Sequence, residues 1–184
     1  DFCLSRGLGD VYKRQGGKYI SYLLTPATVC LAVPLYEQIH LLKKNLKAVA
    51  AGIISGTLAG LCSILLMSKL FGFNHQEYVT MLPKSITTAI GMGVSEELGG
   101  IVTITVAVII ITGVLGNMIA EVVYKIAKIE EPIARGLGLG TSAHAIGTAK
   151  AMELGPVEGA MSSLAIAVAG LLTVVGASVF AGMM

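Results

Sequence analysis

Three long apolar runs constrain the fold of this chain more than any other feature of its sequence. Residues 48–71 carry a single charged side chain, Lys69, and residues 101–120 and 159–184 carry none. Each run reaches the length of about 20 residues at which a helix crosses the hydrocarbon core of a bilayer. Only 13% of all residues are charged, whereas a soluble domain carries about 25%. The sequence therefore predicts an all-α, polytopic membrane protein.

The charge and cysteine content argue against several classes of function. The formal net charge is only +2, without a basic patch that interleaves aromatic residues, so we expect no nucleic-acid partner. Cys30 and Cys62 stand alone in apolar segments, and the acidic residues lack the spacing of an oxygen-ligand cage. We expect neither a metal site nor a cofactor. The sequence holds no nucleophile–base arrangement, and "GLGLG" follows a charged loop rather than a strand, so we do not expect an enzyme.

The first fifteen residues, "DFCLSRGLGDVYKRQ", differ from the rest of the chain. They contain five charged residues without apolar periodicity, and they resemble translated adapter sequence. We therefore expect residues 1–15 to be a non-native leader. Residues 16–184 are then expected to form one transmembrane domain that lacks its natural amino terminus.

The basic residues predict how the chain is threaded through the membrane. A first membrane segment is expected at Tyr19–His40, kinked by Pro26 and Pro34. Positive charge favours the cytoplasmic side, so we expect both basic loops of the chain to be cytoplasmic. Their basic residues are Lys43, Lys44 and Lys47 in the first loop and Lys125, Lys128 and Arg135 in the second.

This threading requires two segments that enter the membrane without crossing it. Between the two basic loops, the apolar runs at 48–71 and from 101 onward already supply the crossings. Residues 82–100 must therefore dip into the membrane and return, or form a broken half-helix. The same holds for residues 136–156 from the opposite side. Non-helical backbone is tolerated inside the hydrocarbon core of the membrane only where protein or a water-filled cavity surrounds it.

The two interrupted segments resemble each other. "TAIGMGVSEELGG" at 88–100 aligns with "HAIGTAKAMELGP" at 144–156 at an offset of 56 residues, without a gap. One crossing separates the copies, so they would enter from opposite faces. Inverted repeats of this kind place the substrate site of secondary transporters near the midplane. The glycines expected to break the helices are Gly91, Gly93, Gly140 and Gly147.

Polar side chains in these segments are the candidate site residues. Lys84 lies where a half-helix amino terminus would attract an anion; alternatively it reaches the headgroups. His144 could carry a proton or donate to an anion; alternatively it links helices for packing. Hydroxyls could bind the substrate or only bond to neighbouring helices. The candidates are Lys84, Ser85, Thr87 and Thr88 in the first segment and Thr141, Ser142, His144 and Thr148 in the second.

Several motifs together resemble the LrgB/CidB family. They are "LLTPATVCLAVPLYEQ" (23–38), "LPKSITTAIGMGVSEELGGI" (82–101), "ARGLGLGTSAHAIGTAKAMEL" (134–154) and "EGAMSSLA" (158–165). The family has proline after the Thr-Thr pair and after Gly-Gly-Ile, where this chain has Ala89 and Val102. The first break must then depend on Gly91 and Gly93.

The resemblance implies two functions. Members of this family are named as antiholin-like modulators of murein hydrolase activity and autolysis, and they act beside a holin-like LrgA/CidA partner. Related pairs move pyruvate, and a plastid relative moves glycolate and glycerate. Carried over by position, the family's motifs comprise Pro83, Lys84, Ser85, Thr87 and Thr88, and Gly140, Thr141, His144, Ala145, Gly147 and Thr148.

We therefore expect a multi-pass protein of the bacterial inner membrane that forms part of a small-monocarboxylate transporter. The anion would bind where the two broken segments meet, with a proton as a candidate coupling ion. We expect an LrgA/CidA-like partner and an oligomer. The alternative is an antiholin-like regulator that restrains its holin-like partner and transports nothing.

Overall fold

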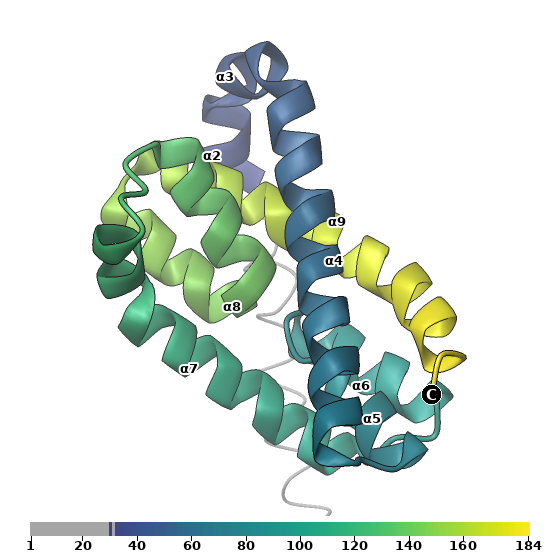
Figure 1. Cartoon of the computed structure of the whole chain (residues 1–184). Helices are drawn as coiled ribbons and strands as arrows, with labels where there is room; N and C mark the ends of the chain where they lie inside the picture. The colour runs from purple at the N-terminus through teal and green to yellow at the C-terminus, as the bar shows by residue number, and fades with distance from the viewer. Residues whose placement is uncertain (1–29, 31) are drawn as a thin grey trace, which may run out of the picture.

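The computed structural model describes residues 30 and 32–184, which contain helices and no strand (Figure 1). The leader and most of the segment predicted at Tyr19–His40 lie outside these residues. The described part of that segment forms the two short helices α2 and α3. The helices are α2 (Ala32–Glu37), α3 (Ile39–Lys44), α4 (Leu46–Phe71), α5 (His75–Met81), α6 (Thr88–Glu97), α7 (Val102–Ile126), α8 (Pro132–Leu154) and α9 (Pro156–Ala181).

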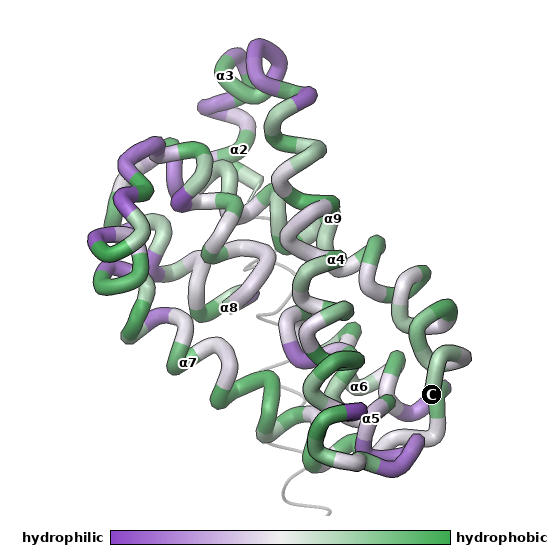
Figure 2. Tube along the Cα trace, viewed as in Figure 1, coloured by the Kyte–Doolittle hydropathy of each residue, from purple (hydrophilic) through white to green (hydrophobic). Residues whose placement is uncertain are grey.

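Among the helices of residues 32–184, three are long and apolar enough to cross a membrane: α4, α7 and α9. They coincide with the three apolar runs, so the predicted spans are confirmed as helices. Local signals fix their ends. Gly72 stops α4 with a φ of +68°, and Pro156 starts α9 at a position where its missing N–H is not needed. In Figure 2 the hydrophilic residues gather near α3, between α7 and α8, and at α5, which are the connections between the spans.

The helices α7 and α9 run antiparallel. α7 begins beside α5, where the backbone N–H of Ile101 donates to Thr80 Oγ1 at 2.8 Å. α9 ends there, because Tyr78 Oη donates to the carbonyl of Phe180 at 3.0 Å. At the opposite end, α7 ends beside the start of α8, where Tyr124 Oη donates to the carbonyl of Arg135 at 2.7 Å, and α9 begins directly after α8.

Helices α5 and α6 form the first of two hairpins. The chain enters through α5, turns at residues 82–87 and returns through α6. Gln76 Nε2, in the first turn of α5, donates to the carbonyl of Gly99 just beyond α6 at 3.2 Å. Both ends of this hairpin therefore lie together, beside the start of α7. A capping box of Asn74 and Glu77 starts α5.

Helix α8 forms the second hairpin, because its backbone breaks once, at His144 (φ 42°, ψ −134°). The first arm starts beside Tyr124 in the last turns of α7. The second arm returns to the same end of α7, where Lys150 Nζ lies 2.7 Å from Glu121 Oε1. The two hairpins thus approach from opposite ends of the α7–α9 pair (Figure 1).

The breaks do not fall at the four glycines expected to make them. Gly91 and Gly93 lie inside α6, after the turn at 82–87, and Gly140 and Gly147 lie inside the arms of α8. Three of the four instead allow close packing. A Cβ on Gly140, for example, would come within 2.6 Å of the carbonyl oxygen of Ser162 in α9. The positive φ that glycine adopts most readily is taken by His144, which the helix packing holds in place.

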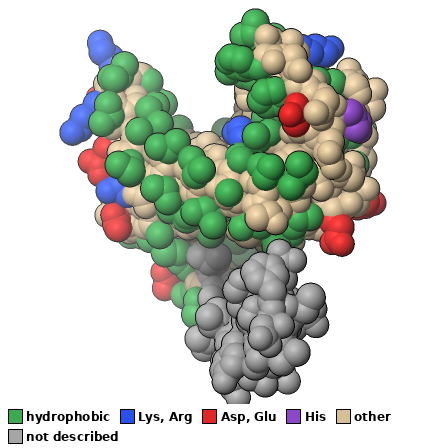
Figure 3. Space-filling view, turned by 90° about the horizontal axis from the view of Figure 1, so that it is seen from below, with side chains coloured by type: hydrophobic (Ala, Val, Ile, Leu, Met, Phe, Trp, Pro, Cys, Tyr) green, Lys and Arg blue, Asp and Glu red, His purple; other side chains and the backbone are tan. Residues whose placement is uncertain are grey.

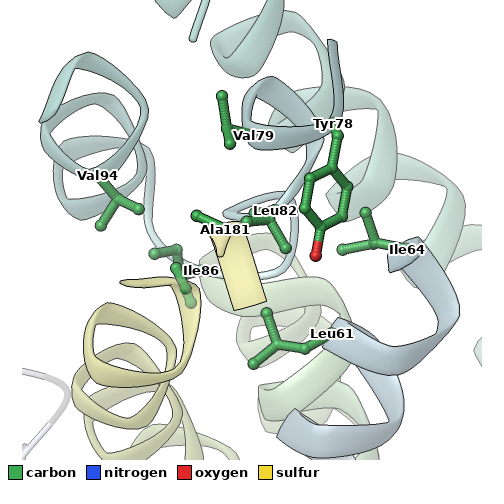
Figure 4. Packing of buried hydrophobic residues seen from close by; sticks show 9 residues of the cluster. Leu61, Ile64, Tyr78, Val79, Leu82, Ile86, Val94 and Ala181 are labelled. Carbon is green, nitrogen blue, oxygen red and sulfur yellow. The ribbon is translucent and has the colours of Figure 1, made fainter. Parts of the chain in front are cut away.

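Buried apolar residues join the hairpins to the spans. The cluster in Figure 4 packs Tyr78, Leu82 and Ile86 of the first hairpin against Leu61 of α4 and Ala181 of α9. A second cluster joins α4, α8 and α9, and a third joins α7 to both arms of α8. The outer surface also carries many exposed hydrophobic side chains, which are spread over the face in Figure 3, as expected for a surface that contacts lipid.

Candidate functional site

The two hairpins converge on a small inner cavity of about 10 Å³. Ser85 reaches it from the turn of the first hairpin, and Thr141 from the first arm of the second, one turn before the break. Thr57 of α4 and Thr173 of α9 complete a set of four hydroxyl-bearing residues from four elements. Space of this size accepts about one water molecule. The lining residues are Gly56, Thr57, Gly60, Leu61, Ile64, Leu82, Ser85, Thr141 and Thr173.

Thr57 is the polar group of this cavity that lacks a partner. It is 7% exposed, and its Oγ1 is the one buried side-chain oxygen or nitrogen in the described part of the chain without a hydrogen bond. Buried hydroxyls almost always have a partner in the protein or an ordered water. Thr57 therefore identifies the inner cavity as a place for a polar occupant.

Lys84 lies at the edge of this site. Its Nζ donates to Ser85 Oγ at 3.0 Å, which places a cation one contact away from the inner cavity. The side chain is half-buried. Among the described residues the ion pairs involve Lys150 and not Lys84. Lys84 therefore has no carboxylate partner among the described residues.

Thr87 and Thr88 begin the returning arm of the first hairpin. Thr87 is the N-cap of α6, without a capping bond from its side chain, and Thr88 is the first helical residue. Both are half-buried and neither lines the inner cavity. The amino terminus of α6 carries the positive end of the helix dipole, and it lies at the hairpin tip beside Lys84 and Ser85.

His144 and Thr148 lie away from the inner cavity and join helices. His144 is 3% exposed, and its Nε2 lies 2.9 Å from the carbonyl oxygen of Ile109 in α7. Because a carbonyl can only accept, Nε2 carries the proton of the neutral ring. Thr148 Oγ1 bonds to the carbonyl of His144 and, at 2.7 Å, to Ser162 Oγ of α9. Ser142 is exposed and donates to the carbonyl of Gly138.

An outer groove of about 460 Å³ lies between α4 and the first arm of α8. Asn45 and Glu131 line its outer end, beside the two basic loops. Its inner end reaches Gly56 and Thr141, which also line the inner cavity. A groove of this volume lies within the range of about 300–1,000 Å³ found for small-molecule pockets. Its lining comprises Asn45, Ala48, Gly52, Ser55, Gly56, Glu131, Ile133, Ala134, Leu137, Gly138 and Thr141.

The sequence anticipated part of this site. Ser85 and Thr141 line the inner cavity and Lys84 contacts Ser85, whereas the other five candidate side chains do not line it. Thr57, Thr173 and Gly56 were missed, because a hydroxyl or glycine inside a long apolar run gives no local signal. No group of three residues that could hold a metal ion occurs in the described ranges.

Comparison with known proteins agrees with the motifs. No solved structure matches the chain. Antiholin-like proteins LrgB from Bacillus cereus strain B4264, Bacillus cereus strain AH187 and Bacillus anthracis strain CDC 684 / NRRL 3495 are each 39% identical to it over 160 residues. The alignments cover 87% of this chain and 70% of each relative. The LrgB-like family matches residues 9–183, and the chain belongs to that family.

Proposed function

We propose that this protein is the carrier part of a small-monocarboxylate transporter in the bacterial inner membrane. The observation that carries the proposal is the convergence of two helical hairpins on a hydroxyl-lined cavity, with Lys84 beside it. Discontinuous helices that meet in this way form the substrate sites of secondary transporters. Ionisable residues in such positions are functional candidates because their charge is costly in lipid.

The helix bounds support an inverted repeat. The sequence offset of 56 carries the start of α5 (75) to 131, the end of α6 (97) to 153 and the end of α7 (126) to 182. In the structure, α8 starts at 132 and ends at 154, and α9 ends at 181, so each boundary agrees with the shifted position to within one residue. The two units are also antiparallel, since α7 and α9 run in opposite directions. This arrangement fits alternating access, in which one repeat moves against the other around a fixed site.

The anion binds at the tip of the first hairpin in this proposal. Lys84 supplies a formal charge, the amino terminus of α6 supplies free N–H groups, and the surrounding hydroxyls donate further hydrogen bonds. The inner cavity has room for about one water, so the hairpin tips must separate when an anion enters. His144, the ionisable residue at the break of α8, is the candidate carrier of a coupled proton.

An antiholin-like regulator that transports nothing is the second candidate. The relatives are named antiholin-like proteins, and that name implies a holin-like, LrgA/CidA-type partner for this chain, within an oligomer. A protein that only restrains a partner needs lipid-facing and partner-facing helices but no polar centre. The four converging hydroxyl-bearing residues therefore favour transport, and a carboxylate flux would itself change the proton gradient that acts on autolysis.

Uptake of radiolabelled pyruvate and glycolate tests the proposal. The host would lack its own carriers, and the protein would be expressed with and without an LrgA-type partner. We expect saturable uptake that Lys84→Gln weakens about 10- to 100-fold, because a hydrogen bond to a charged group contributes about 1.5–3 kcal/mol.

Lys69→Gln is the matched control, because it removes an exposed lysine from the end of α4 and should leave uptake unchanged. Saturable uptake that Lys84→Gln does not affect would reject this anion site. If the protein gives no uptake with or without the partner, but its expression still changes autolysis, the protein is an antiholin-like regulator and not a carrier.

A further inference from the structure

Two residues are shared by the outer groove and the inner cavity. Gly56 of α4 and Thr141 of α8 line both spaces. We propose that the Thr141 side chain is a gate against the Gly56 backbone, which closes the inner cavity to water and solutes from the outer groove. The proposal deepens the transport function proposed above and rests on it for its biological role, although the barrier itself can be measured without transport.

The contact between Gly56 and Thr141 is tight. A Cβ on Gly56 would lie 2.9 Å from Thr141 Oγ1 and 3.2 Å from Thr141 Cβ, so not even a methyl group fits between them. Thr141 is 9% exposed. Its Oγ1 donates to the carbonyl of Leu137 at 2.8 Å, and this bond holds the side chain in the closed position. A threonine in a helix has a second accessible rotamer, so the barrier can open by a local rotation.

The two sides of this barrier differ in chemistry. On the outer side, the groove ends at Asn45 and Glu131 beside the basic loops, which the charge distribution places in the cytoplasm. On the inner side lies Thr57, whose buried Oγ1 has no partner among the described residues. An unpaired hydroxyl beside a space for one water gives a polar occupant of the inner cavity a hydrogen-bond partner.

Reactivity of two single cysteines tests the gate. Ser55→Cys places a thiol in the outer groove, and Thr57→Cys places one at the inner cavity, two residues further along the same helix. Both would be made in a variant without the natural cysteines, in membranes treated with a small water-soluble thiol reagent. We expect Ser55→Cys to react rapidly and Thr57→Cys slowly. Adding Thr141→Ala should accelerate Thr57→Cys by about tenfold or more, the change in population that a lost hydrogen bond produces.

Ser142→Ala is the matched control for Thr141→Ala. Ser142 is the adjacent residue, is exposed and lines neither space, so its truncation should not change the reactivity of Thr57→Cys. Unchanged reactivity of Ser55→Cys in the Thr141→Ala protein would show that the fold persists.

Each other result would overturn the gate. Equal rates for the two cysteines would mean that no barrier separates the spaces, and a slow Ser55→Cys would mean that the groove holds no water. A Thr57→Cys rate that Thr141→Ala leaves unchanged would place the barrier elsewhere. Because none of these readings requires uptake, a protein that fails to transport but shows the expected rates would reject the carrier function and retain the gate.

Discussion

His144 combines a strained backbone with a buried, hydrogen-bonded side chain. Its φ of 42° is unusual for a residue with a Cβ, and such conformations cost about 1–3 kcal/mol. The side chain offsets this cost: Nε2 bonds to the carbonyl of Ile109, and the ring occupies the space beside Gly113, where a Cβ would lie 2.8 Å from Cε1 of His144. The imidazole thus holds the reversal of α8 against the middle of α7.

Two substitutions at this position separate the backbone from the side chain. His144→Ala and His144→Gly both remove the bond to Ile109, but only glycine relieves the positive φ. We expect both to lower stability, and His144→Gly to be the more stable of the two by about 1–2 kcal/mol. Thermal unfolding of the purified proteins in detergent measures the difference. An alanine variant at least as stable as the glycine variant would show that the backbone at 144 is not strained.

Some residues at the inner cavity could be singled out from the sequence and others could not. Lys84 attracts notice because ionisable groups are rare in apolar segments, and Ser85 and Thr141 because they lie in the two interrupted segments. Thr57 and Thr173 do not, because one hydroxyl in a long apolar helix is unremarkable until the fold brings four such residues together. The break at His144 escaped prediction for a different reason: sequence rules assign positive φ to glycine, whereas here tertiary contacts of the imidazole impose it.

At the level of elements, Gly140 allows α8 to pack closely on α9. A Cβ at Gly140 would meet the Ser162 carbonyl at 2.6 Å and Ala165 Cβ at 2.7 Å. We expect Gly140→Ala to destabilise the protein by about 1–3 kcal/mol, because overpacking forces the two helices apart. Gly138→Ala is the matched control, two residues away on the exposed side, where the nearest atom to a Cβ is Tyr124 Oη at 3.7 Å.

The control should be neutral or stabilising by up to about 1 kcal/mol, since alanine is the better helix former. Thermal unfolding in detergent again gives the measurement, with a shift of about 2–4 °C for each kcal/mol in a chain of this size. If Gly140→Ala were as stable as Gly138→Ala, the α8–α9 contact would be more compliant than its geometry indicates.

The long helices were predictable and the hairpins only partly so. Run length alone locates α4, α7 and α9, because about 20 apolar residues can satisfy their backbone in lipid only as a helix. The charge distribution predicted that residues 82–100 and 136–156 return to the side of the membrane they came from, which stays a prediction, and it could not place the turns of the two hairpins. α8 remains helical almost throughout despite four glycines between 136 and 147, because packing against α7 and α9 overrides their low propensity.

At the scale of the molecule, the helices divide into a central and a peripheral set. In the most apolar stretch of α9, 44% of the residues are buried, against 17% in that of α7, so α9 belongs to the central set and α7 presents most of its surface to the outside. The Ile101–Thr80 and Tyr78–Phe180 bonds hold the first hairpin at one end of this pair. The Tyr124–Arg135 bond and the Lys150–Glu121 ion pair hold the second at the other end.

This arrangement predicts the membrane side of four exposed positions. Gln76 and Glu97 mark the two ends of the first hairpin, and Glu130 and Glu153 those of the second. In a cysteine-free protein, we expect Gln76→Cys and Glu97→Cys to react with a membrane-impermeant thiol reagent in intact cells. Glu130→Cys and Glu153→Cys should react only after permeabilisation, because positive charge holds the basic loops in the cytoplasm.

Whether the two positions of one hairpin label from the same side of the membrane matters more than which side that is. If Glu130→Cys and Glu153→Cys label from opposite sides, α8 crosses the membrane, the two hairpins no longer enter from opposite faces, and the inverted repeat is lost. If each pair labels together but the sides are exchanged, the repeat and the converging site remain, and the outer groove opens away from the cytoplasm. The labelling therefore tests the architecture on which the transport proposal depends before any substrate is known.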